Sequence, residues 1–331
     1  MKKNGFDFGK IMSWLAANPI PLIVVVLVIV PFISPYKALA TQMVILGLLA
    51  LGYNILYGYT GLLSFGHAAY FGLGAYATGI ILIRTNCSLL TAIGAGVFVA
   101  FVGACLIGFL CLRRRGIYFA LLTLAFAQML YFTANMWESL TGGEAGLRNI
   151  PHPPLAIPGL FSVDVYAPTR FYFFVLAFAV IALLLLNRIL ESPFGRVLQG
   201  IRENENRAKA LGYNTNRIKW LSFVLSGIFS GLAGSLYTLH IGFVGIDELY
   251  WEMSGKILMM ILLGGPGTFF GPFVGAGIFL YLEDIISGYT RYWMIVLGPI
   301  FVLSVLFFPQ GVWGTVRLFL ERLRKTPLEE G

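Results

Sequence analysis

Long uncharged apolar runs recur along the whole chain. A helix needs about 20 apolar residues to cross a bilayer, and these runs are continuously apolar, unlike the alternating segments of about ten residues in membrane β-barrels. We therefore predict an all-α, polytopic transmembrane helical bundle in which a single domain covers residues 19–308. The pattern predicts about ten spans, at residues 20–36, 39–57, 61–83, 89–112, 116–136, 171–190, 220–243, 253–265, 271–287 and 291–308.

The composition agrees with this class of protein. Of the 331 residues, 58% are hydrophobic and 11% are charged, and the mean hydropathy is +0.82, far from the values of an average soluble domain. The sequence contains no paired catalytic carboxylates, no HExxH motif and no cysteine spacing typical of a metal cluster or a disulfide framework. We therefore predict that the chain is not an enzyme and has no catalytic residue and no metal site.

Basic residues gather on one side of the predicted bundle. Ten spans place both termini on the same side, and all but six of the 23 Lys and Arg residues fall there. Because cytoplasmic connections of membrane proteins are enriched in Lys and Arg, we predict a multi-pass membrane protein with a cytoplasmic N-terminal segment at 1–18 and a cytoplasmic basic tail at 309–331. The net charge of +8 thus reflects topology, and we predict no nucleic-acid partner. The basic residues assigned to the outer side are Lys37, Arg84, Arg148, Arg170, Lys256 and Arg291, and the acidic residues there include Glu248, Glu283 and Asp284.

One long charged interval, Ser192–Lys219, interrupts the apolar pattern. Charged side chains at the centre of a membrane helix cost about 2.5 to 3.5 kcal/mol each, so this interval faces water or a partner protein. Apolar residues near helical spacing predict one or two short amphipathic helices, and Gly212 ends the pattern as glycines commonly end helices. A solvated loop between two spans is the ordinary alternative.

Two further connections differ from simple turns. Residues 137–170 form a predicted external loop that contains several Gly and Pro residues and is long enough to fold over the outer mouth, where it either caps the pathway or docks a partner. Gly264–Pro272, with the sequence GGPGTFFGP, is either a cytoplasmic turn or an interruption within the membrane. It lacks the GK[ST] ending of a P-loop, so we predict no nucleotide site on this chain.

Small residues recur at steps of three and four in the third span and again in the seventh. Because no hydrophobic force drives helices together in lipid, small side chains stabilise a bundle by letting backbones approach closely. The glycine-rich segment between the eighth and ninth spans extends this group. We therefore predict close helix packing at Gly61, Ala68, Gly72, Ala75, Gly79, Gly227, Gly231, Gly264, Gly265 and Gly267.

Five polar side chains lie within or beside the second and third spans. A polar group in a membrane needs either a hydrogen-bond partner or a water-filled path. A structural hydrogen bond and a contact with a translocated solute therefore both stay open as explanations. The candidates for a translocation path are Asn54, Thr60, Ser64, His67 and Tyr70.

Three stretches of the sequence carry a family resemblance. Gly52–Tyr76, Arg202–Tyr237 and Leu262–Asp284 resemble, in this order and spacing, the membrane permeases of branched-chain amino acid ABC importers. Within that family they look most like the longer, M-type permease subunit. The similarity covers most of the chain, from about residue 39 to about residue 314.

The resemblance implies an ABC importer permease that translocates branched-chain or related hydrophobic amino acids delivered by an external solute-binding protein. It also implies a related permease subunit and two cytoplasmic ATPase subunits as partners, so that ATP and Mg²⁺ bind the partners and no cofactor binds this chain. The interval at about 192–219 then corresponds to the loop that couples a permease to its ATPase. The coupling residues implied in this way are Arg202, Glu203, Asn204, Arg207, Ala208 and Gly212.

Two alternatives stay open at this point. Similar permeases serve urea, short amides and other small amino or carboxylic acids. A channel or ion-coupled carrier that needs no ATPase would contain an intramembrane acid or base to bind the driving ion. No lone charge lies in the middle of a predicted span, which favours the importer.

Overall fold

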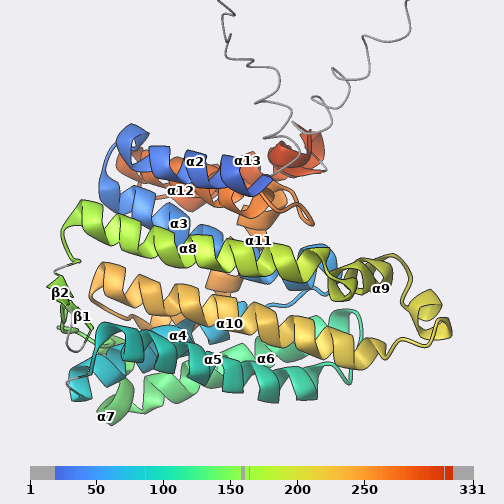
Figure 1. Cartoon of the computed structure of the whole chain (residues 1–331), viewed down its shortest axis with the longest axis horizontal. Helices are drawn as coiled ribbons and strands as arrows, with labels where there is room; N and C mark the ends of the chain where they lie inside the picture. The colour runs from blue at the N-terminus through green and yellow to red at the C-terminus, as the bar shows by residue number, and fades with distance from the viewer. Residues whose placement is uncertain (1–18, 86, 158–160, 164, 309, 316–331) are drawn as a thin grey trace, which may run out of the picture.

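The computed structural model describes residues 19–85, 87–157, 161–163, 165–308 and 310–315 (Figure 1). The predicted N-terminal segment 1–18 and the tail beyond residue 315 lie outside the described residues. In chain order the elements are α2 (Pro19–Ile33), α3 (Lys37–Asn54), the π-helical turn η1 (Ile55–Tyr59), α4 (His67–Arg84), α5 (Leu89–Cys111), α6 (Ile117–Met136), α7 (Glu138–Thr141), the 3₁₀ turn η2 (Gly143–Ala145), β1 (Leu155–Ile157), β2 (Phe161–Val163), α8 (Pro168–Glu191), α9 (Pro193–Ala210), α10 (Thr215–Ile241), the 3₁₀ turn η3 (Ile246–Leu249), α11 (Trp251–Gly264), α12 (Gly271–Tyr289) and α13 (Trp293–Phe307).

Each predicted span contains one of these helices, so the prediction of a polytopic helical bundle is confirmed. The number of full crossings is a separate question. By length and composition, the described helices that could cross a membrane are Lys37–Tyr59, Leu89–Cys111, Ile117–Met136, Pro168–Glu191, Thr215–Ile241 and Trp293–Thr315. These six helices support a multi-pass membrane protein, whereas a total of about ten spans stays a prediction.

The long helices run side by side and define two ends of the bundle. One end, called the α9 end, is formed by α9, residues 112–116 and residues 265–270 (Figure 1). The opposite end, called the hairpin end, holds the antiparallel pair β1–β2, in which Ala156 lies opposite Ser162. There, residues of the predicted external loop are fixed to the chain that follows α10, because Leu147 and Val244 exchange backbone hydrogen bonds of 2.9 and 3.1 Å.

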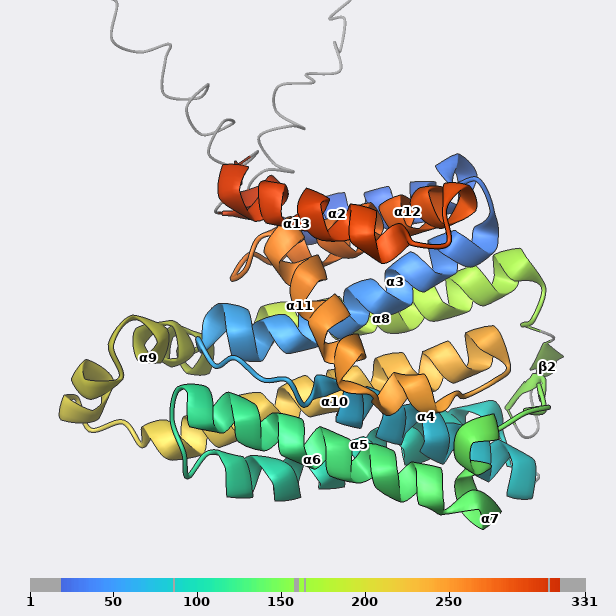
Figure 2. The same cartoon turned by 180° about the vertical axis from the view of Figure 1, so that it is seen from behind.

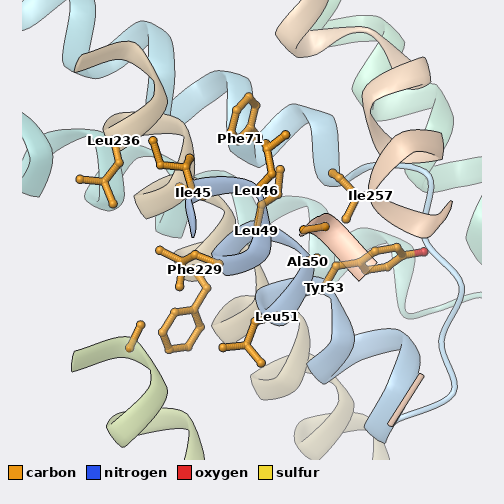
Figure 3. Packing of buried hydrophobic residues seen from close by; sticks show 14 of the residues in the cluster. Ile45, Leu46, Leu49, Ala50, Leu51, Tyr53, Phe71, Phe229, Leu236 and Ile257 are labelled. Atoms are coloured by element: carbon orange, nitrogen blue, oxygen red, sulfur yellow. The ribbon is translucent and has the colours of Figure 1, made fainter. Parts of the chain in front are cut away.

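Helices α3 and α10 lie in the interior, and the other long helices surround them. Figure 3 shows the core around α3, where Ile45 and Leu49 are surrounded by side chains from several other helices, including Phe71, Phe229 and Ile257. By contrast, α5, α6, α8 and α13 expose large apolar side chains on their outer faces. A helix bundle in lipid is expected to present such apolar outer faces.

Glycines let the backbones of α4, α5 and α10 approach closely. A Cβ atom at Gly231 would lie 2.2 Å from that of Ala100, and one at Gly227 would lie 2.4 Å from that of Ala104. A Cβ atom at Gly234 would lie 2.0 Å from the carbonyl oxygen of Phe71. The other predicted packing positions in α4 are enclosed as well: Ala68 and Ala75 are buried, Gly72 lies against Leu249, and Gly79 lies against Leu147 and Ile150.

The predicted third span differs from the structure at its start. The helix begins at His67 rather than at Gly61, and residues 61–66 are not helical. Side chains of other helices take the backbone donors of this segment: Ser64 N–H donates to the Tyr53 hydroxyl at 3.1 Å and Phe65 N–H donates to Thr123 Oγ1 at 3.1 Å. Non-helical backbone is tolerated at membrane depth where it is buried in protein and bonded in this way. Gly61 therefore lies outside the predicted line of small residues.

Helix α11 also starts inside the bundle. Ser254, in its first turn, accepts a hydrogen bond of 2.9 Å from the backbone N–H of Ala68 at the start of α4. The adjacent His67 lies beside Ser226, which at 1.5 Å per residue is about 16 Å along α10 from its first residue, Thr215. Both α4 and α11 therefore begin near mid-height, and they lead to opposite ends of the bundle (Figure 2).

Candidate functional site

The charged interval forms α9, which projects from the bundle and consists of two helical segments (Figure 1). The break lies at Asn204, whose φ of −158° and ψ of 98° are not helical. The Asn204 side chain caps the second segment, because Arg207 N–H donates to Asn204 Oδ1 at 3.0 Å. After that segment, Gly212 has a φ of +88°, a left-handed conformation that glycine adopts without a Cβ clash.

Glu205 fixes the second segment of α9 to the rest of the bundle. Its Oε1 atom lies 2.9 Å from Lys209 Nζ, 3.0 Å from Lys219 Nζ and 3.9 Å from Arg115 Nη2. It also accepts a hydrogen bond of 3.1 Å from Thr215 Oγ1. Burial alone would raise the pKa of Glu205, but the bonds from Lys209, Lys219 and Thr215 outweigh it and lower the pKa to about 2.

Glu205 was not among the predicted site residues, although the Glu205–Lys209 spacing of four residues is a signal for a helical ion pair. The contacts to Lys219 and Arg115 could not be read from spacing. They join α9 to the start of α10 and to the turn after α5.

The first segment of α9 is linked to the interior by a hydrogen bond at its last turn. Arg202 donates from Nη1 to the carbonyl oxygen of Gly58 in η1. Asn54, one turn earlier, accepts from Gly267 N–H at 2.9 Å and donates to the Thr268 carbonyl oxygen at 2.8 Å. The glycine-rich segment 265–270 is therefore a turn between α11 and α12 at the α9 end.

Positive φ angles explain two of the glycines in that turn. Gly265 has a φ of +119° and Gly267 a φ of +78°. A Cβ atom at Gly264 would lie 1.7 Å from the Gly271 carbonyl oxygen, so α11 and α12 approach closely at this point. The turn is thus compact, and its Gly267 lies against the Arg202 side chain.

The outer surface of α9 is exposed and mixed in character. Glu203, Asn204 and Arg207 are exposed, while Ala208 is buried. Leu211 and Tyr213, directly after the helix, are also exposed, although apolar side chains of this size are usually covered. Such a projecting element, with charges beside apolar side chains, is suited to bind another protein.

Two recesses flank α9. One of about 500 Å³ is lined by Gly58, Tyr59, Gln199, Arg202, Glu203 and Gly267. The other, of about 520 Å³, is lined by Phe109, Leu112, Arg113, Asn214, Asn216, Arg217 and Trp220. The candidate coupling residues thus lie on a surface with a projection and two hollows.

The candidate path residues lie elsewhere, inside the chain. His67 is fully buried, with Nε2 2.7 Å from Ser226 Oγ and Nδ1 3.2 Å from Ser64 Oγ. Its ring lies 4.1 Å from that of Tyr53, centroid to centroid. His67, Ser64, Ser226 and Tyr53 therefore form one buried hydrogen-bonded cluster, and of these four residues only His67 and Ser64 were predicted to line the path.

The remaining candidates are enclosed as well. Thr60 Oγ1 donates to the Ile55 carbonyl oxygen at 2.9 Å, and Asn54 bonds the 265–270 turn as described. The buried Tyr70 hydroxyl has no hydrogen-bond partner among the described residues. Neither recess is lined by any of the five, so a role in the translocation path stays a prediction.

The described residues contain no group of three or more His, Cys, Asp or Glu side chains arranged to hold a metal ion. The contacts described in the two regions are hydrogen bonds and ion pairs. The α9 end has an exposed, charged surface, and in the middle of the bundle neutral polar side chains hydrogen-bond one helix to another.

Comparison with known proteins places this architecture in a family. A sequence model of the protein family described as the branched-chain amino acid transport system permease component matches residues 36–305. The high-affinity branched-chain amino acid transport system permease protein LivM of Salmonella typhimurium is 29% identical over 297 residues, which cover 84% of this chain and 70% of that protein. The LivH permease protein of Escherichia coli is 28% identical over 288 residues, covering 81% of this chain and 90% of that protein.

A third relative shows how far the similarity extends. The probable branched-chain amino acid transport permease protein LivM of Methanocaldococcus jannaschii is 26% identical over 317 residues, which cover 82% of this chain and 85% of that protein. No solved structure matches the chain. Because the family model covers most of the sequence, the chain belongs to the branched-chain amino acid transport system permease family.

Proposed function

We propose that this chain is the permease subunit of an ATP-driven importer in a bacterial inner membrane. Its substrates are branched-chain or related hydrophobic amino acids, delivered by an external solute-binding protein. Its partners are a related permease subunit and two ATPase subunits, which hold ATP and Mg²⁺. The named relatives support the substrate class, because they are permease proteins of branched-chain amino acid transport.

The α9 end faces the cytoplasm in this proposal. Support comes from the positive charge there, since Lys and Arg are enriched in cytoplasmic connections. The basic residues of the α9 end, together with those of the adjoining end of α8 and start of α10, are Arg113, Arg114, Arg115, Arg188, Arg196, Arg202, Arg207, Lys209, Arg217 and Lys219. On this orientation the hairpin end meets the solute-binding protein.

The observation that carries the proposal is the attachment of α9. The helix is exposed toward a partner, yet it is fixed to α10 through Glu205 and to η1 through Arg202. A force applied to Arg207 or Leu211 therefore reaches two interior helices without crossing a flexible linker. ATP drives the cycle only if it binds one arrangement of the subunits better than the other. In this proposal α9 transmits the change between these arrangements from the ATPase subunits to the permease.

The motion has a defined route into the bundle. Arg202 acts on Gly58 at the end of α3, and Asn54 in the same helix holds the 265–270 turn between α11 and α12. A displacement of α9 thus shifts α3, α11 and α12 together. Of these helices, α11 begins near mid-height, beside the start of α4.

The test uses the complete importer reconstituted in proteoliposomes, with ATP-dependent L-leucine uptake as the readout. We expect Gly212→Phe and Arg207→Glu each to abolish uptake while the protein stays in the membrane, because both change the exposed surface of the second segment. Gly116→Phe is the matched control for the first variant, since Gly116 also has a positive φ, of +58°, and open space around it at the same end.

Arg196→Glu is the control for the second variant, because Arg196 is an exposed arginine on the first segment of α9. Both controls should retain uptake within about twofold of the unmodified importer. Unchanged uptake in Gly212→Phe and Arg207→Glu would remove α9 from coupling. An unmodified complex that transports L-leucine without ATP would exclude the importer itself.

A further inference from the structure

Two arginines that lack a carboxylate partner line the recess between the end of α5 and the start of α10. This recess of about 520 Å³ contains Arg113, from the turn after α5, and Arg217, from the first turn of α10. Both residues are exposed. Among the residues that the structure describes, no Asp or Glu lies within ion-pair distance of either guanidinium. The other polar lining residues, Asn214 and Asn216, are neutral. The recess therefore carries two positive charges that nothing in its own lining compensates.

Aromatic side chains make up much of the remaining lining. The Arg113 guanidinium lies 4.8 Å from the ring centre of Phe109. The Trp220 indole donates from Nε1 to the Cys105 carbonyl oxygen at 3.2 Å, so it is fixed against α5. Both rings line the same recess as the two arginines. The recess thus combines cationic groups with apolar surface.

The recess lies where α5 leaves the membrane. Helix α5 is a candidate span of 23 residues, so at 1.5 Å per residue it is about 35 Å long and matches a hydrocarbon core of about 30 Å. Arg113 follows two residues after its last residue, Cys111, and Trp side chains such as Trp220 are enriched at the same depth. Figure 1 shows α5 and α10 side by side, with the end of α5 and the start of α10 at the α9 end. The recess is therefore level with the lipid head groups.

An apolar stripe leads away from the recess along the outer face of α5. Val102, Leu106 and Phe109 follow one another at steps of four and three residues, so they lie on one face of the helix. These side chains are 37%, 64% and 59% exposed. In a membrane such a face contacts acyl chains. Because Phe109 belongs both to the stripe and to the recess, the two form one continuous surface.

We propose that this recess binds the head group of an anionic phospholipid, whose phosphate pairs with Arg113 and Arg217 while an acyl chain lies along the stripe of α5. Guanidinium groups bind phosphate through strong charge-assisted hydrogen bonds, and basic pockets between membrane helices are suited to anionic head groups. A zwitterionic head group carries a cation beside its phosphate, and the recess has no carboxylate to receive it. The continuous apolar stripe favours a lipid over a soluble phosphate ester. The inference requires only that the chain lies in a membrane, so it does not depend on the import function.

The test measures the lipid that the purified full-length chain binds. The chain in detergent is titrated with dioleoyl phosphatidylglycerol or with dioleoyl phosphatidylcholine, and bound lipid is counted by native mass spectrometry. We expect the unmodified chain to bind phosphatidylglycerol at least about tenfold more tightly than phosphatidylcholine. Arg113→Gln with Arg217→Gln should weaken the binding of phosphatidylglycerol by at least about tenfold and leave that of phosphatidylcholine unchanged, because the phosphate loses both charged partners. Equal binding of the two lipids by the unmodified chain would overturn the site.

Arg188→Gln with Arg196→Gln is the matched control. It removes the same charge from the same end of the bundle, and both arginines are exposed and lie outside the recess. Its affinity for phosphatidylglycerol should stay within about twofold of the unmodified chain. Equal losses in the two double variants would show general electrostatic attraction and would overturn the recess as a site. Glycerophosphoglycerol, the head group without acyl chains, should not displace the lipid at equal concentration, and displacement would make a soluble phosphate ester the ligand instead.

Trp220 provides a second measurement that needs no arginine variant. Its fluorescence is obtained as the difference between the unmodified chain and Trp220→Phe, in vesicles of phosphatidylcholine with a minor fraction of phosphatidylglycerol. Bromine atoms on an acyl chain quench a tryptophan that the chain contacts, and they are placed on one lipid or on the other. We expect bromine on the minor phosphatidylglycerol to quench Trp220 more than bromine on phosphatidylcholine does. Trp137, which is exposed at the end of α6 and is measured in the same way with Trp137→Phe, should follow the bulk lipid composition. Quenching of Trp220 that also follows the bulk composition would overturn the site.

Discussion

At mid-height, His67, Ser64 and Ser226 are fully buried and bonded to one another, whereas at the α9 end Glu203 and Arg207 are exposed. The first cluster is neutral, and each of its hydrogen-bonding partners belongs to this chain. The second is charged, and its outer surface has no cover among the described residues. Polar side chains therefore join helices at mid-height, whereas at the α9 end they leave an exposed charged surface.

The difference follows from the surroundings of each region. In the middle of a bundle there is little water to bond a polar group, so a side chain that lacks a protein partner destabilises the fold. At the end, water solvates the charges until a partner displaces it. Substitutions in the middle are therefore expected to act on stability, and substitutions at the α9 end are expected to act on transport at constant stability.

The largest expected effect comes from the closest approach in the middle. A Cβ atom at Gly234 would lie 2.0 Å from a backbone oxygen of Phe71, which cannot move aside as a flexible side chain could. We expect Gly234→Leu to separate α10 from α4 and to remove the protein from the membrane fraction, measured by immunoblotting. Gly298→Leu, in the open surroundings of α13, should be present at the normal level. Normal amounts of both variants would contradict the packing of α4 against α10.

A smaller effect is expected at the hydrogen-bonded cluster itself. Replacing His67 with Ala removes the partner of the Ser226 hydroxyl, leaves the Ser64 hydroxyl with the Gly66 N–H, and opens a cavity beside Tyr53. We expect a loss of about 1 to 3 kcal/mol of stability, seen as a lower unfolding temperature of the purified complex. Ser230→Ala is the control, because the Ser230 hydroxyl donates to the Ser226 carbonyl oxygen of its own helix rather than to another helix among the described residues. If His67 instead lines the path, uptake should fall with no change in unfolding temperature.

The sequence indicated the helices because run length and apolar character decide which segments enter lipid. It did not indicate where α4 begins, since that depends on Tyr53 and Thr123 from other helices bonding residues 64 and 65. The depth at which α11 begins was not evident for a related reason. The chain after α10 folds back into the bundle before α11 starts, and no local pattern records that return.

At the α9 end, the sequence indicated more of the site. The charges of residues 202–207 and the position of Gly212 were evident from spacing, and the two segments of α9 agree with the one or two short helices that were predicted. What spacing could not supply was the attachment, because Arg202 and Glu205 bond residues far away in sequence. Substitutions of Arg202 and Glu205 therefore test the comparison between the two regions most directly.

For Arg202 we expect a transport defect without a stability defect. Arg202→Met keeps the length of the side chain and removes the hydrogen bond to Gly58, so α9 moves without carrying η1. ATP-dependent L-leucine uptake should fall about tenfold, which corresponds to about 1.4 kcal/mol, while the unfolding temperature stays constant. Arg196→Met, on the exposed side of the same segment, should retain uptake. A large fall in unfolding temperature would make Arg202 part of the structural core instead.

The smallest effect is expected from pH, and its sign follows from Glu205. Because the bonds to Lys209 and Lys219 lower the pKa of Glu205 to about 2, their stabilisation is complete above its ordinary pKa of about 4 and is lost only as the pH falls from about 4 toward 2. Hydrogen exchange of residues 205–214, corrected for the intrinsic rate, should therefore report the same protection from pH 5 to pH 9. Glu205→Gln should lower that protection across the whole range, since the amide cannot form the ion pairs. A loss of protection centred near pH 6 in the unmodified protein would show that another group holds α9 in place.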